Sequence, residues 1–94
     1  MKSVVIAGFA AVSLLAAYGA SASEQLAKSN GCMNCHAMDA KKVGSSIKDI
    51  SAKYKGKADA QQTLTAKISE GKGHPKTKAS GDDLKAIVSW MTSQ

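Results

Sequence analysis

The sequence predicts a small all-α domain of about four helices that follows an N-terminal export signal. Two observations indicate helices. After residue 22 the larger apolar residues recur at spacings of three and four, and glycines stand where these periodic segments stop. No segment alternates strictly between apolar and polar residues, as a half-buried strand would. The pattern therefore favours packed helices without a sheet.

The N-terminal segment has the composition of a secretory signal peptide. Lys2 is the only charged residue before Glu24, and the stretch from Val4 to Ala17 contains only apolar and small residues. Ala20-Ser21-Ala22 then offers the small-x-small pattern that signal peptidase accepts. The uncharged stretch is also long enough for a membrane anchor, but its many small residues and the missing basic flank favour cleavage.

We therefore predict a signal peptide over residues 1–22, a mature domain over residues 23–94, and a periplasmic location without a stable membrane anchor. Cleavage leaves 72 residues with one tryptophan, one tyrosine and no phenylalanine. A chain this short, with so few large side chains, usually needs disulfides, a metal or a cofactor to be stable. We expect such a group to fill the middle of the domain.

The first three expected helices each end at a glycine, the residue that most readily follows a helix. They cover residues 24–30 before Gly31, the region of Ile47, Ile50 and Tyr54 before Gly56, and residues 58–70 before Gly71. The segments 37–46 and 71–79 are expected to be loops.

The last helix has the clearest pattern. We expect Ser80 to cap its N-terminus, with Asp82 and Asp83 in the first turn, where the helix dipole favours anions. One apolar stripe follows at positions i, i+3, i+4 and i+7, namely Leu84, Ile87, Val88 and Met91.

The segment Cys32-Met33-Asn34-Cys35-His36 is a C-x-x-C-H sequence, which is typical of covalent haem attachment. Two thiols at this spacing can add to the two vinyl groups on one edge of a porphyrin. The histidine that follows is then held beneath the ring, with its imidazole directed at the iron. The sequence thus predicts one haem c, bound through Cys32 and Cys35, with His36 as an iron ligand.

Three other interpretations of the motif are weaker. A thioredoxin-like redox pair needs a βαβ context, which the pattern lacks. A zinc site would have only His36 and His74 to complete it. A disulfide across so short a loop would stabilise the chain little.

The mature chain resembles the class I cytochromes c, especially the short periplasmic monohaem kind. The resemblance rests on the segments 31–37, 42–44 and 47–50 and on the C-terminal helix from Asp82 to Trp90. It implies a small cytochrome c fold, with helices wrapped around one covalently bound haem. It also implies a single-electron carrier rather than an enzyme.

Two positions depart from the family. Ser45 stands where the family has a proline whose carbonyl accepts the proximal histidine's Nδ1–H, and a serine carbonyl can do the same. His74-Pro75 stands where the family has its axial methionine, sixteen residues before Trp90. We therefore expect His74 as the second axial ligand and a reduction potential below that of His/Met relatives.

Other groups are candidates for the sixth ligand. Met33 lies between the attachment cysteines, Met38 is close to His36, and Met91 belongs to the apolar stripe. Lys76 and Lys78 would first have to lose a proton. An open distal site is a further alternative. The corresponding alternative function is a haem-based gas sensor or ligand-binding protein with a displaceable His74.

The charge of the mature domain bears on its partners. Its 12 lysines and 7 acidic residues give a net charge of +5, and it contains no arginine. Ionised haem propionates would lower this to about +3. The arginine and aromatic content of a nucleic-acid groove is missing. We expect a monomer that meets redox proteins with acidic docking surfaces.

Overall fold

The computed structural model describes residues 22–94 of the chain. The predicted signal peptide falls almost wholly on residues 1–21, outside this part, and stays a prediction. Residues 22–29 are helical and are followed by a short 3-10 helix, η1 (Cys32–Asn34). Three α-helices come next, α2 (Ile47–Tyr54), α3 (Ala60–Glu70) and α4 (Gly81–Met91), and residues 22–94 contain no strand. The predicted all-α fold is confirmed.

The helix ends follow the local chemistry of the sequence, with small differences. Gly31 (φ 81°) and Gly71 (φ 71°) adopt the left-handed conformation after the first helix and α3, where a side chain would be strained. The third helix begins at Ala60 rather than residue 58, because a turn closed by the Ala60 N–H and the Lys57 carbonyl precedes it. Ser80 occupies the capping position of α4, but its hydroxyl makes no capping hydrogen bond, so the predicted side-chain cap is wrong.

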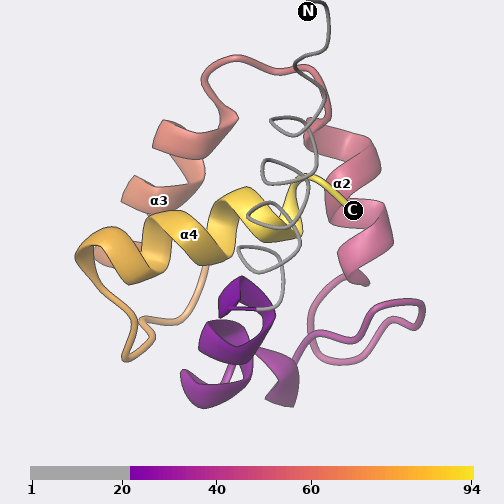
Figure 1. The fold of residues 1–94 in the computed structure, drawn as a ribbon, viewed down its shortest axis with the longest axis horizontal. Coiled ribbons are helices and arrows are strands. Elements are labelled where there is room, and N and C mark those ends of the chain that lie inside the picture. Colours follow the sequence, from indigo (N-terminus) through magenta and orange to yellow (C-terminus); the bar gives the residue numbers. More distant parts are fainter. Residues whose placement is uncertain (1–21) are drawn as a thin grey trace, which may run out of the picture.

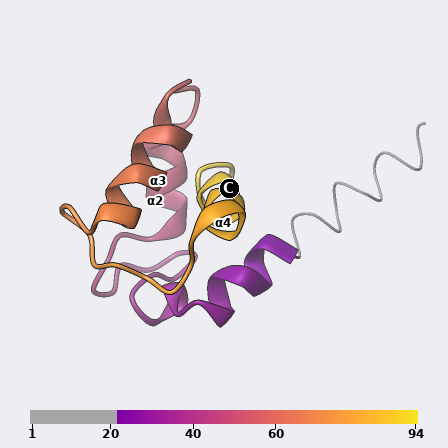
Figure 2. The ribbon, with the colours of Figure 1, turned by 90° about the vertical axis from the view of Figure 1, so that its left-hand side faces the viewer.

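Helix α4 is the central element of the domain (Figure 1). It packs against both α2 and α3, and the Gln61 amide of α3 donates a 2.7 Å hydrogen bond to the Lys85 carbonyl of α4. Figure 2 shows the helical segment 22–29 on the other side of α4 from α2 and α3. Among residues 22–94, the helices lack the length and apolar character that spanning a bilayer requires.

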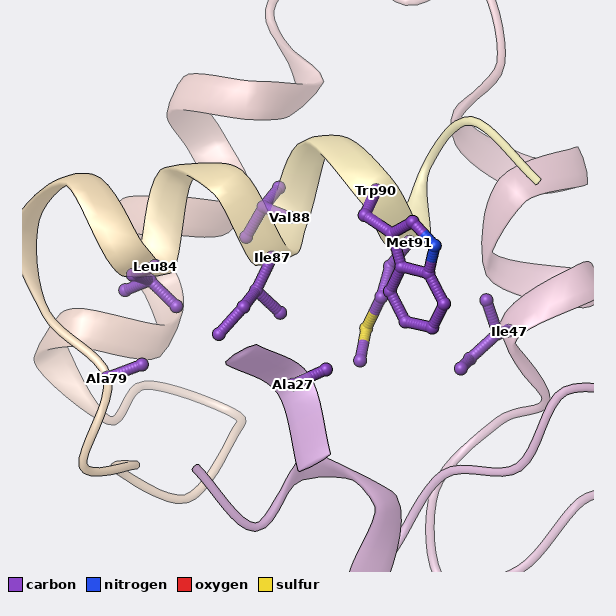
Figure 3. Close-up of a cluster of buried hydrophobic side chains, with 8 residues drawn as sticks. All are labelled: Ala27, Ile47, Ala79, Leu84, Ile87, Val88, Trp90 and Met91. Carbon is purple, nitrogen blue, oxygen red and sulfur yellow. The ribbon is translucent and has the colours of Figure 1, made fainter. Parts of the chain in front are cut away.

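The hydrophobic core lies along the predicted stripe of α4 (Figure 3). Ala27 from the first helix and Ile47 from α2 are fully buried against it. Trp90 is 7 % exposed and belongs to this cluster. The core consists of Ala27, Ile47, Ala79, Leu84, Ile87, Val88, Trp90 and Met91. Four of these residues, Leu84, Ile87, Val88 and Met91, also line a cleft.

Candidate cofactor site

The C-x-x-C-H motif folds into a tight turn just after the first helix. Gly31 turns the chain, and the backbone N–H groups of Cys35 and His36 both donate to the Cys32 carbonyl, at 3.2 and 3.1 Å. Both thiols are partly buried and neither forms a disulfide. Burial raises the pKa of the Cys32 thiol. Both thiols therefore remain available for covalent attachment of another group.

His36 is held from behind by the loop that follows it. Its Nδ1 lies 2.7 Å from the Ser45 carbonyl oxygen, as predicted for the residue that replaces the family's proline. Gly44 packs directly against the imidazole, since a Cβ built there would lie 2.6 Å from Cε1. The Gly44 N–H also donates to the Cys35 carbonyl at 2.8 Å, which ties this loop to the motif.

His74 comes from the loop between α3 and α4 and faces the same cleft. Its Nδ1 lies 2.7 Å from the Pro75 carbonyl oxygen. Gly73, just before it, has a φ of 72° and packs against the side chain of Lys67, which would lie 3.0 Å from an added Cβ. The loop thus holds His74 through backbone conformation and packing as well as through a hydrogen bond.

The two imidazole rings lie close together although they are 38 positions apart in the sequence. Their centres are 6.2 Å apart and their planes differ by only 9°. In each ring Nδ1 meets a carbonyl oxygen, which can only accept a hydrogen bond, so Nδ1 carries the proton. In the neutral imidazole this leaves Nε2 of each histidine with a free lone pair, which is the state that binds a metal.

A cleft formed by two adjoining hollows surrounds the histidines. The larger, of about 620 Å³, is lined by Cys32 and Cys35, and the smaller, of about 300 Å³, by Lys53 and Tyr54. Seven residues line both hollows, namely His36, Ser45, Ile68, Gly73, His74, Val88 and Met91. An apolar cleft of this size, with a few polar groups directed into it, is typical of cofactor sites.

The lining residues fit a haem. Two thiols stand at one end of the cleft for thioether bonds, and the apolar side chains of α3 and α4 offer a surface for a flat macrocycle. Two imidazoles with free Nε2 atoms lie between the hollows. Two histidines and two thioether-forming cysteines are the donor set that a covalently bound haem uses.

The structure also places the other groups considered as ligands. Met91 lines the cleft and is buried in the core, as predicted, whereas Met33 and Met38 pack against the core. Lys76 and Lys78 line the larger hollow near His74. The sequence does not indicate two positioning contacts, namely Gly44 against His36 and Lys67 against Gly73. The glycines themselves were visible in the sequence, but their partners depend on tertiary packing.

An all-helical domain with this motif at the edge of a haem-sized cleft defines a c-type cytochrome. Residues 20–94 match the family described as "Cytochrome c". The chain is 39% identical to cytochrome c-552 of Nitrosomonas europaea, over 97% of this chain and 96% of the relative. It is 35% identical to cytochrome c-551 of Pseudomonas aeruginosa, over 100% and 99%.

Solved structures agree with this result. The class 1 cytochrome MtoD from Sideroxydans lithotrophicus superimposes with a TM-score of 0.69 at 34% identity, covering 78% of this chain and 92% of that one. Nitrosomonas europaea cytochrome c552 gives 0.65 at 37% identity, covering 74% and 96%. The chain belongs to the cytochrome c family, as a class I c-type cytochrome. It carries one haem c, bound covalently through Cys32 and Cys35, and its relatives are electron carriers.

Proposed function

We propose that this protein is a periplasmic single-electron carrier whose haem iron is bound by His36 on one side and His74 on the other. The observation that carries this proposal is the spacing of the two imidazoles. A metal–imidazole bond is about 2 Å long and the ring centre lies roughly 1 Å beyond the bonded nitrogen, so two imidazoles on opposite sides of one metal have centres about 6 Å apart. The observed separation is 6.2 Å.

The residues around the histidines suit electron transfer. The bound haem supplies an iron that gains and loses one electron. His36 and His74 are each held by a carbonyl hydrogen bond of 2.7 Å, so neither ring has to move when the charge of the site changes. Ile68, Val88 and Met91 keep the interior of the cleft apolar. A rigid, partly exposed site of this kind favours fast electron exchange with a partner rather than a chemical reaction on a substrate.

The periplasmic location rests on the sequence. The leader over residues 1–22 and its small-x-small site support export and cleavage after Ala22. An exported chain also agrees with the C-x-x-C-H motif at Cys32 to His36, because haem c is attached outside the bacterial cytoplasm. We infer a diffusing carrier rather than a membrane-anchored one.

The ferric optical spectrum of the purified holoprotein tests the proposed ligands. We expect a low-spin spectrum without the thioether–iron charge-transfer band, because both axial positions are held by imidazole nitrogen. Reduced protein exposed to carbon monoxide should keep its spectrum, since the gas must displace a braced histidine. A thioether band would indicate methionine ligation, and prompt carbon monoxide binding would favour the gas sensor instead.

The lysines support a partner with an acidic docking surface. Lys28 pairs with Glu24 at 3.4 Å and Lys48 with Asp39 at 2.6 Å, and no other ion pair is formed among residues 22–94. Most of the positive charge is therefore free to attract an anionic partner from a distance. Lys76 and Lys78 lie at the cleft itself, on the same side as the thiols.

This charge predicts that electron exchange with an anionic reagent slows as salt rises. The rate of oxidation by hexacyanoferrate(III) should fall several-fold between low salt and 0.1 M, where the Debye length shrinks to about 10 Å. Stopped-flow absorbance measures it, and an uncharged quinone oxidant serves as the control that should not respond. A salt-independent rate with hexacyanoferrate(III) would leave the lysines with no role beyond solubility.

A further inference from the structure

The two histidines share an arrangement that their spacing alone does not require. Each Nδ1 is anchored at the same distance, 2.7 Å, to a carbonyl of its own loop, that of Ser45 for His36 and that of Pro75 for His74. The two ring planes then differ by only 9°. Two imidazoles on opposite sides of one metal are free to adopt any relative rotation about the axis that joins them, so the parallel setting comes from the loops.

We propose that the Ser45 and Pro75 carbonyls lock the two axial imidazole planes parallel, with Pro75 as the positioning residue for His74. This inference rests on the proposed axial role of His74. The Pro75 carbonyl is only one residue from the ring that it orients, so three backbone angles decide where the oxygen lies. The proline ring fixes one of them, the φ of residue 75, near −65°.

Packing braces both anchors. On the His74 side, Gly73 holds a left-handed φ of 72° and the Lys67 side chain packs against it. On the His36 side, Gly44 lies so close that an added Cβ would be 2.6 Å from Cε1 of the ring. Rotation of the His36 imidazole would therefore require its loop to move, and the Lys67 contact holds the backbone from which His74 projects.

Parallel planes have an electronic consequence. An imidazole donates π electron density along the normal of its ring. Two iron d orbitals can interact with this π density. Two parallel rings act on the same one of them, and its energy then differs from that of the other. Two perpendicular rings would act on one orbital each and leave the pair nearly degenerate. Hydrogen bonds from Nδ1 to carbonyls also raise the basicity of each ligand, which favours the ferric state.

Electron paramagnetic resonance of the frozen ferric holoprotein tests the proposal. We expect a rhombic low-spin signal with three resolved lines, because parallel planes separate the d orbitals. A single, strongly anisotropic low-spin line would mean perpendicular planes and would overturn the inference while leaving two histidine ligands in place. A high-spin or thioether-ligated ferric spectrum would instead overturn the proposed function itself, so the two failures are distinguishable.

Two variants test the role of the loops. Pro75→Gly frees the φ of residue 75 and should keep the low-spin optical spectrum while shifting and broadening the rhombic lines. Lys72→Gly is the matched control, because Lys72 lies in the same loop, is exposed and lines neither hollow. An unchanged signal in Pro75→Gly, or an equal change in the control, would show that Pro75 has no positioning role. Gly44→Ala, which pushes the His36 ring from the other side, should shift the same lines and provides an independent check if Pro75→Gly yields no holoprotein.

Discussion

Replacing His74 with alanine should convert the ferric protein from a low-spin form to a high-spin or water-bound form. The substitution removes the ring whose centre lies 6.2 Å from that of His36 and opens the cleft on that side. Alanine offers no lone pair, so the sixth position becomes free. The reduced variant should then take up carbon monoxide promptly, whereas the wild type should remain inert. Ferric and ferrous–carbon monoxide spectra near neutral pH measure both effects.

Two further variants sharpen this result. His74→Met should keep a low-spin haem but raise the reduction potential, because Met/His ligation favours the ferrous state, provided that the short loop delivers the sulfur. Lys76→Ala controls for a nearby cleft-lining side chain and should leave the ferric spectrum unchanged. Identical ferric spectra for wild type and His74→Ala would show that His74 is only a loop residue and that another group holds the sixth position.

Without haem, the chain should be largely unfolded. The core is a single cluster along α4, and the apolar side chains of Ile68, Val88 and Met91 would face an open cleft of several hundred Å³. One core in a chain below about 70–80 residues rarely supplies more than roughly 3–5 kcal/mol. Ordering the backbone costs about 1–2 kcal/mol per residue, so the loss of the haem contacts should tip the balance.

Circular dichroism of the Cys32→Ala/Cys35→Ala variant, which cannot attach haem, measures this effect. We expect most of the helical signal to be lost and no cooperative thermal transition. The wild-type holoprotein in the same buffer is the control and should melt cooperatively. A cooperative melt of the haem-free variant near that of the holoprotein would mean that the polypeptide core suffices by itself.

Much of the architecture could be predicted from the sequence, because it depends on neighbours along the chain. The stripe of Leu84, Ile87, Val88 and Met91 repeats at the helical period, and all four side chains are buried. Gly71 ends α3 in the left-handed conformation. The C-x-x-C-H turn places both thiols and His36 within one short segment. Local sterics and hydrogen bonds decide such features, so a pattern read along the chain is enough.

Details that depend on competing local bonds were less predictable. The third helix begins at Ala60 because a turn forms ahead of it, and the Ser80 hydroxyl makes no cap although its position is correct. The 3-10 helix at Cys32–Asn34 had no signal beyond the motif itself. In each case two local arrangements differ by about one hydrogen bond, roughly 1 kcal/mol, which a residue pattern does not resolve.

The sequence by itself determined the all-helical class, the attachment motif and the two candidate histidine ligands. Only the tertiary structure decided that His36 and His74 line the same cleft, with ring centres 6.2 Å apart and planes 9° from parallel. It also revealed Gly44 against the His36 ring and Lys67 against Gly73. The two histidines belong to segments that are far apart in the sequence, so the distance between them depends on how the helices pack, as α4 does against α2 and α3. No local pattern encodes how separate helices pack.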